Sequence, residues 1–216
     1  VILTASSGMK FYKEIDQLND EQFDESVNAI MKNTNYLSQT IDTFRDFFKQ
    51  KNGQSLFNIK ETFEKTKKLI TSKYNNSDIT IIDDIDDLEL YGLESEFIQV
   101  FMIILNNTKD AFEEKNIEQN KFIFINIYKD DTFVNIVIND SAGGIPVDII
   151  NRIFEPYFTT KHKSQGTGIG LYITEEIISK HMNGSITVSN KKFDYKNSSY
   201  CGAEFVIKLP LDTIKE

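Results

Sequence analysis

The sequence lacks the features that stabilise secreted chains or anchor chains in membranes. Its one cysteine, Cys201, cannot form an internal disulfide, which fits a reducing compartment. The longest uninterrupted apolar run, Val100 to Leu105, is far shorter than the ~20 residues that span a bilayer. The chain begins without methionine and without a basic, apolar leader. We expect a cytoplasmic fragment of a longer protein that begins inside a helix and makes no membrane contact itself.

Positive charge is also scarce. The chain has 24 Lys and Arg against 33 Asp and Glu, which gives a formal net charge of -9. Nucleic acids bind to clustered basic side chains rather than to a net acidic field, so no nucleic-acid partner is expected. With 216 residues, of which 40% are hydrophobic, the chain is long enough for one or two globular domains.

A heptad pattern dominates the first 50 residues. Residues spaced alternately by four and three form one stripe: Phe23, Val27, Ile30, Thr34, Leu37, Ile41, Phe44 and Phe48. This spacing predicts a helix that needs a helical partner, with Asn19-Asp20 as its N-cap and a second helix before it. We interpret residues 1–50 as an antiparallel helical hairpin, half of a four-helix bundle formed by two chains. Packing of the hairpin on the rest of its own chain is the alternative.

The pattern changes at QKNGQS, and we take residues 51–55 as a linker to a second domain over 56–216. Helices are expected at 63–70, 95–115 and about 169–181, and strands at 79–83, 121–130, 132–140, 185–190 and 203–210. FDYKNSSY, residues 193–200, is expected to be a flexible surface turn, and the acidic run 83–89 a solvated loop rather than a metal site. The predicted fold class is α+β, with helices packed on one face of a mixed sheet.

Three local motifs carry candidate chemistry, and the first is an aspartate at the end of a strand. TFVNIVIND ends in Asp140 and continues into SAGGIP. A fixed carboxylate followed by glycines suits a planar hydrogen-bond donor such as the exocyclic amino group of adenine. A β-turn with Asp at its first position would have the same pattern.

The second motif lies on the helix that contains FMIILNNTKDAF. Asn107 and Asp110 are three residues apart and therefore share one face. A side-chain amide oxygen suits Mg²⁺, which takes its remaining ligands from waters and phosphates. The alternative is a solvated asparagine on an amphipathic helix.

The third motif is GTGIG, residues 166–170, directly before a predicted helix. Glycines there let an anion reach the unpaired amides of the helix N-terminus. No Lys-Ser or Lys-Thr follows, so this is not a Walker loop, and Leu171 occupies the place of the third glycine in the dinucleotide fingerprint.

Taken in order with FEPYFTTK and a late Gly-Ala-x-Phe strand, these motifs resemble the ATP-binding catalytic domain of bacterial sensor histidine kinases. That superfamily also includes gyrase, mismatch-repair and heat-shock chaperone ATPases. The resemblance covers roughly residues 56–211, and residues 35–49 resemble the second helix of the kinase dimerisation and phosphotransfer domain.

The resemblance implies an ATP site with Mg²⁺. Asn107 corresponds to the metal ligand and Asp140 to the adenine-reading aspartate, with Gly144 lining the base. Lys161 corresponds to a lysine that approaches the triphosphate, so Asn107 and Lys161 are the catalytic candidates. Gly202 is expected to be structural. The complete expected site is Asn107, Asp110, Asp140, Ala142, Gly144, Ile145, Phe158, Thr159, Thr160, Lys161, Gly166, Thr167, Gly168, Ile169, Gly170 and Leu171.

The implied reaction is attack by a histidine imidazole on the γ-phosphate of Mg·ATP. Neither His162, in the lid over the nucleotide, nor His181 matches the phosphoacceptor, which we expect upstream of residue 1. The fragment alone should therefore not autophosphorylate. Lys161 and Lys163 around His162 form a basic island suited to a triphosphate. The implied partners are a second copy, joined through residues 1–50, and the receiver domain of a response regulator.

Three residues depart from the family pattern. Ile103 replaces the first asparagine of the metal helix, Ala142 replaces a glycine beside Asp140, and Ala203 stands where many relatives have threonine. Two alternatives remain open. One is an ATPase or chaperone module of the same superfamily, against which Ile103 argues, because the catalytic glutamate of such hydrolases would occupy position 103. The other is a structural dimerisation module with a degenerate nucleotide pocket.

Overall fold

The computed structural model describes residues 2–32, 34, 54–73, 78–161 and 166–211. They belong to two compact units, Val1–Lys51 with Thr159–Thr167 and Asn52–Phe158 with Gly168–Glu216. The described part of the first unit is mainly helical and the second unit combines a sheet with helices, so the predicted α+β class is confirmed.

The first unit contains the two predicted N-terminal helices. Helix α1 spans Ile2–Glu14, and a second helix runs from residue 20 through residue 32. Asn19 caps the second helix, because its Oδ1 accepts a hydrogen bond of 2.8 Å from the backbone N–H of Gln22. The predicted N-cap is therefore confirmed at Asn19. The later heptad positions, from Leu37 onward, lie outside the described residues.

The second unit is built on a mixed five-stranded sheet. Its strands are β2 (Ile79–Ile85), β4 (Lys121–Lys129), β5 (Phe133–Asp140), β6 (Ser185–Tyr195) and β7 (Ser198–Pro210), in the order β2-β4-β5-β7-β6. Only the β2–β4 pair is parallel. The long apolar strands β4, β5 and β7 occupy the middle of the sheet.

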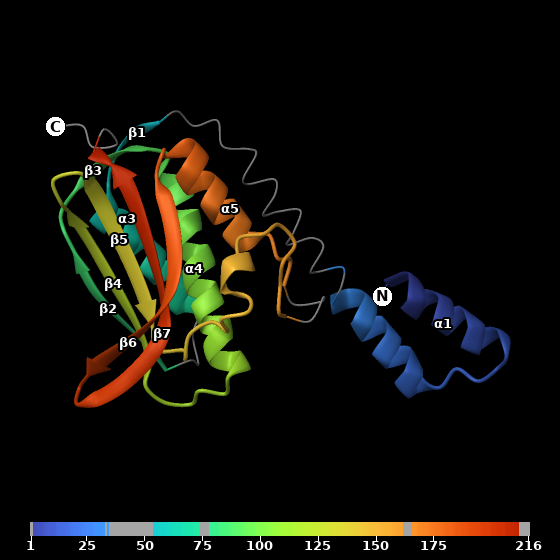
Figure 1. The fold of residues 1–216 in the computed structure, drawn as a ribbon. Helices are drawn as coiled ribbons and strands as arrows, with labels where there is room; N and C mark the ends of the chain where they lie inside the picture. Colours follow the sequence, from blue (N-terminus) through green and yellow to red (C-terminus); the bar gives the residue numbers. More distant parts are fainter. Residues whose placement is uncertain (1, 33, 35–53, 74–77, 162–165, 212–216) are drawn as a thin grey trace. The chain divides into compact units, whose positions relative to one another are not determined.

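Helices cover one face of this sheet. Figure 1 shows α3 (Ile59–Lys73), α4 (Glu94–Glu114) and α5 (Gly170–Glu176) on the same side of the strands. The core between the layers includes these fully or almost fully buried side chains: Phe63, Phe101, Ile104, Leu105, Ile123, Ile125, Ile136, Ile138, Ile177, Ile207 and Leu209. A π-helical turn, Ile177–His181, extends α5 to the predicted end of that helix. In the described ranges, no helix is both long and apolar enough to cross a membrane.

The acidic run forms more regular structure than the sequence analysis predicted. Asp83 to Ile85 complete β2, and Glu89 begins β3 (Glu89–Gly92), so only residues 86–88 form the connection. Strand β3 pairs antiparallel with β1 (Ser55–Asn58), a ribbon that the sequence analysis missed. Asp83 forms an ion pair with Lys67 of α3. The expectation of a loop over 83–89 was wrong at both ends, because pairing with β4 and β1 outweighs the low strand propensity of aspartate and glutamate.

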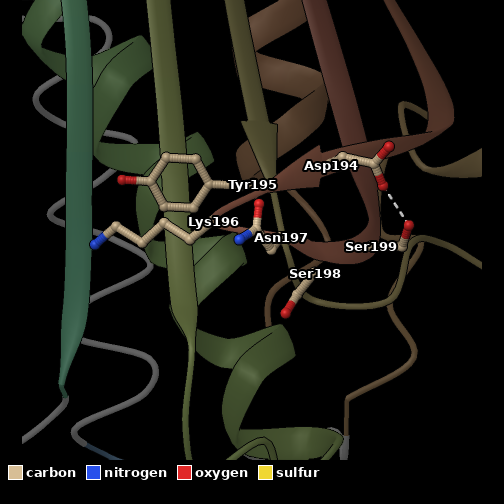
Figure 2. A pocket seen from close by; sticks show the side chains of 6 residues that line it. All are labelled: Asp194, Tyr195, Lys196, Asn197, Ser198 and Ser199. Atoms are coloured by element: carbon tan, nitrogen blue, oxygen red, sulfur yellow. Dashed lines mark hydrogen bonds between the residues drawn. The ribbon is translucent and has the colours of Figure 1, made fainter.

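The turn expected over residues 193–200 is present but much shorter than predicted. Strand pairing between β6 and β7 continues to Tyr195 and Ser198, leaving a turn of two residues, Lys196 and Asn197. Both have positive φ, 47° and 62°, as a type I′ hairpin turn requires. Figure 2 shows this end of the hairpin, where a hollow of about 510 Å³ is lined by Asp194 to Ser199. The hollow contains no residue of the predicted site.

Candidate active site

Asp140 is the last residue of β5 and only 4% exposed. Its Oδ1 accepts hydrogen bonds from the backbone N–H groups of Ala142 (2.8 Å) and Ala203 (3.1 Å). The hydroxyl of Thr108, on α4, lies 3.4 Å from its Oδ2. Asp140 is therefore held by its own loop, by β7 and by the helix layer.

Burial raises the pKa of the Asp140 carboxyl above its ordinary value, because desolvation penalises the charged form. The N–H groups of Ala142 and Ala203, the positive charge of Lys115 and the Thr108 hydroxyl oppose this effect. The result is a desolvated carboxyl that gains free energy from a buried hydrogen-bond donor. An exocyclic amino group is a donor of that kind.

The loop after Asp140 is fixed by two side chains from distant parts of the chain. The ammonium of Lys115, directly after α4, donates to the carbonyl oxygens of Ala142 (2.7 Å) and Gly144. On β6, Asn190 accepts from the N–H of Ile145 and donates to its carbonyl oxygen, both at 2.7 Å. Gly144 has φ of 75°, and a Cβ there would lie 2.5 Å from Asn190 Oδ1. The backbone at position 144 thus requires glycine.

Helix α4 presents the candidate metal ligand on the face that meets α5. A Cβ added to Gly170, the first residue of α5, would lie 3.2 Å from Ile103 Cγ2. Asn107 follows Ile103 by four residues and so lies on the same face, with Asp110 one turn further along. Asn107 and Asp110 are both half-buried. The start of α5 and the amide of Asn107 therefore belong to one neighbourhood.

A close backbone contact fixes Gly168. It has φ of 64°, and a Cβ there would lie 2.4 Å from the carbonyl carbon of Tyr157. The guanidinium of Arg152 in turn lies over the ring of Phe158, with the Arg152 Cζ atom 4.5 Å from the centre of the ring. The chain before residue 159 and the chain after residue 167 are thus in contact at Gly168.

Residues 92–213 match the family model described as histidine kinase-, DNA gyrase B- and HSP90-like ATPase. The chain belongs to this ATPase family. Sporulation kinase A of Bacillus subtilis is 27% identical over 182 residues, which cover 83% of this chain and 28% of that protein. The chain spans less than a third of the length of the first curated relatives that it matches.

Solved structures give the same result. The catalytic domain of the histidine kinase ThkA is 27% identical, with a TM-score of 0.59, covering 73% of this chain and 95% of that one. A structure of ThkA in complex with the response regulator TrrA has a TM-score of 0.62 at 22% identity, covering 97% of this chain and 57% of that one. The recognised family is therefore confirmed, and an ATPase domain implies ATP binding.

Each compact unit contains some of the residues predicted for the site of this ATPase domain. The second unit holds Asn107, Asp110, Asp140, Ala142, Gly144, Ile145, Phe158, Gly168, Ile169, Gly170 and Leu171. The remaining predicted residues, Thr159, Thr160, Lys161, Gly166 and Thr167, belong to the first unit. There a Cβ on Gly166 would lie 2.6 Å from Thr159 Oγ1. His162 and Lys163, the rest of the expected basic island, lie outside the described residues.

The sequence analysis missed Thr108, Lys115 and Asn190. Thr108 supplies a hydroxyl to Asp140, although Ala203 itself provides only a backbone N–H. No local signal marks Lys115 or Asn190, because each contacts the loop only after the chain has folded. Ala142 is buried and bonds Asp140 through its backbone, so its methyl group is accommodated within the fold.

Gly202 lies inside β7, where its backbone contacts Asp140. A Cβ at this position would lie 1.5 Å from the carbonyl oxygen of Asp140, so Gly202→Ala must displace a central strand. We expect a loss of about 3 kcal/mol in the free energy of unfolding, measured by urea denaturation. Gly92→Ala is the control, because its Cβ would meet only Phe57 at an ordinary 3.8 Å. Equal effects of the two substitutions would contradict the steric argument.

The raised pKa of Asp140 makes stability depend on pH. The folded protein holds this proton more tightly than the unfolded chain, so the contribution is complete below the ordinary pKa, ~3.9, and is lost as pH rises through the folded-state pKa. Asn in place of Asp140 keeps an oxygen for both N–H groups but does not titrate. The free energy of unfolding of the native protein minus that of Asp140→Asn should therefore fall as pH rises, as denaturation at several pH values can show. The exposed Asp148→Asn serves as the control, and a flat difference for Asp140→Asn would refute the assignment.

Proposed function

We propose that this chain is the ATP-binding core of a sensor histidine kinase. It binds Mg·ATP and supports transfer of the γ-phosphate to a histidine outside the chain, for relay to an aspartate of a response regulator. The domain division that we propose is a helical hairpin over residues 1–50, a linker over 51–55 and the catalytic domain over 56–216. This assignment rests on the family match and on the names of the relatives.

The surroundings of Asp140 are the observation that carries the proposal. Its Oδ1 already accepts two backbone N–H groups, whereas its Oδ2 is contacted only by a long, 3.4 Å approach of Thr108 among the hydrogen bonds described above. A carboxylate oxygen can accept more than one donor, so it retains capacity for the amino group of adenine. Guanine presents an acceptor at that position and would face the carboxylate unfavourably.

The phosphate end fits Mg²⁺ with ligands shared between protein and nucleotide. Asn107 offers an amide oxygen on the face of α4 that meets Gly170, and Mg²⁺ commonly takes most of its ligands from phosphates and waters. When bound, the metal would neutralise charge on the phosphates. Lys161, Gly166 and Thr167 are proposed to contribute charge and backbone amides there, as the family resemblance implies.

Hydrolysis of ATP is the alternative within the family. Hydrolases of this superfamily need a carboxylate, at the position that corresponds to residue 103 of this chain, to activate water. Here that residue is Ile103, which packs at the start of α5. An apolar side chain cannot accept the proton of an attacking water. Phosphotransfer to an external imidazole is therefore favoured over hydrolysis.

A longer chain that includes the natural upstream segment provides the direct test. With γ-labelled ATP we expect acid-labile, alkali-stable label on an upstream histidine and at least a tenfold loss of label in Asp140→Asn, on the order of one buried charge-assisted hydrogen bond. Bound nucleotide without phosphohistidine in the native protein would refute the kinase assignment. Absence of Mg·ATP binding at millimolar concentration would instead favour a degenerate structural module.

We also propose that the first unit forms a homodimer. Several large apolar side chains on or directly next to its two helices are exposed, namely Leu3 (79%), Phe11 (58%), Ile15 (44%), Phe23 (47%) and Met31 (59%). Burying such side chains against a second copy would stabilise the dimer by ~25 cal/mol for each Å² of apolar surface removed from water. The second of these helices carries the first part of the heptad pattern that predicts a bundle, and Phe23 belongs to that pattern.

A charge placed in the apolar stripe should dissociate this dimer. Phe23→Glu lowers the net charge by one and removes an exposed ring from the heptad stripe, so analytical ultracentrifugation should show a monomer where the native chain sediments as a dimer. Lys32→Gln, which changes the net charge equally at an exposed position of the same helix, should remain dimeric. A monomeric native chain would contradict the proposal.

A further inference from the structure

Resting on the proposed ATP site, we propose that Lys115 is a positioning residue that sets the purine-recognition loop, residues 140–145, through its bonds to the Ala142 and Gly144 carbonyl oxygens. The residue lies one position after the end of α4, outside every motif that marks the site. Its role would be to fix where Asp140 and Gly144 stand before a base arrives.

The loop needs such support because its conformation is unusual. Gly143 and Gly144 both have positive φ, 78° and 75°, so the loop departs from the extended backbone of the preceding strand. The Lys115 ammonium donates hydrogen bonds to two carbonyl oxygens of the loop, that of Ala142 at 2.7 Å and that of Gly144. A charged donor forms stronger hydrogen bonds to carbonyl groups than a neutral one does. The two bonds together fix the loop's curvature on the side of α4.

Asn190 holds the opposite side of the same loop. Its amide forms two hydrogen bonds of 2.7 Å with the backbone of Ile145 and lies against Gly144. Asn190 carries no charge, whereas Lys115 also acts electrostatically on Asp140. Variants of these two residues therefore separate mechanical support of the loop from the effect of charge.

Lys115 also connects the two ends of the proposed nucleotide site. It follows Asn107 by eight residues, which places the two about 12 Å apart along the axis of α4. Helix α4 thus carries the candidate metal ligand in its C-terminal half, and the loop's support directly follows its last residue. A shift of the loop relative to α4 would change the distance between the base and phosphate positions.

The charge of Lys115 shifts the pKa of Asp140 in a definite direction. The positive charge of Lys115 opposes the rise in the pKa of Asp140 that burial causes. Among the described residues, Lys115 is the charged side chain whose electrostatic effect shifts this pKa. Removing it should raise that pKa further. Because the ionised carboxylate is the form that accepts the amino group of adenine, ATP binding should then be lost at a higher pH than in the native protein.

Four variants of the whole chain test the proposal by calorimetric titration with Mg·ATP from pH 5 to 8. Lys115→Met should weaken Mg·ATP binding about fivefold at neutral pH, and the affinity should fall at a higher pH on acidification than in the native protein. Lys115→Arg should keep most of the native affinity and most of the native pH dependence. Asn190→Ala should weaken binding without moving the pH dependence. Lys67→Met, which removes an ion-paired lysine of α3, should bind as the native protein does.

The pKa of Asp140, measured without nucleotide from its carboxyl ¹³C shift, separates this inference from the proposed function. A higher pKa in Lys115→Met supports the role of Lys115 even where the native chain fails to bind Mg·ATP, an outcome that would refute only the proposed function. Native-like affinity, pH dependence and Asp140 pKa in Lys115→Met would overturn the inference. Circular dichroism of each variant, together with Lys115→Arg as the charge-preserving form, excludes misfolding as the cause.

Discussion

The contact between Asp140 and β7 is the constraint on which the rest of the site depends. The backbone of Gly202 lies so close to the Asp140 carbonyl that no side chain fits between them. This closeness lets the N–H of Ala203 reach the Asp140 carboxyl. The end of β5 is thereby fixed in the middle of the sheet, and the loop that leaves it is aimed at the helix layer.

Burial of this carboxyl costs stability, and the surrounding structure limits that cost. Two backbone N–H groups, a hydroxyl and a nearby lysine all favour the charged form, although desolvation remains the largest effect on the pKa. A site that leaves part of this cost uncompensated gains more from a ligand that supplies the missing donor. In the proposed nucleotide site, the stability lost at Asp140 would thus be coupled to recognition of an amino group.

Much of the fold could be predicted from the sequence because its signals are local. The alternating residues of β4 and β5 and the long period of α4 identify their elements directly, and the order of motifs leads to Asp140, Asn107 and the glycines. The ribbon of β1 and β3 and the outer part of the β6–β7 hairpin were missed. Each depends on pairing between strands rather than on its own composition, and the hairpin turn at Lys196 and Asn197 has no glycine to mark it.

The supports of the site could not be predicted, because they join residues far apart in the chain. Thr108 is 32 residues from Asp140, Lys115 is 27 from Ala142 and Asn190 is 45 from Ile145. A threonine, a lysine at a helix end and an asparagine in a strand are ordinary surface choices by composition. Only the register of β6 and the direction of α4 bring them to the loop.

Ile103 relates the geometry of the site to its proposed chemistry. Water must lose a proton as it attacks phosphorus, so a hydrolase benefits from a carboxylate beside the γ-phosphate. A neutral imidazole attacks through a nitrogen lone pair and needs no base to generate its nucleophile. An isoleucine packed at the start of α5 is therefore compatible with transfer to histidine and also excludes the group that would promote wasteful hydrolysis. The departure at position 103 thus argues for phosphotransfer rather than against a working nucleotide site.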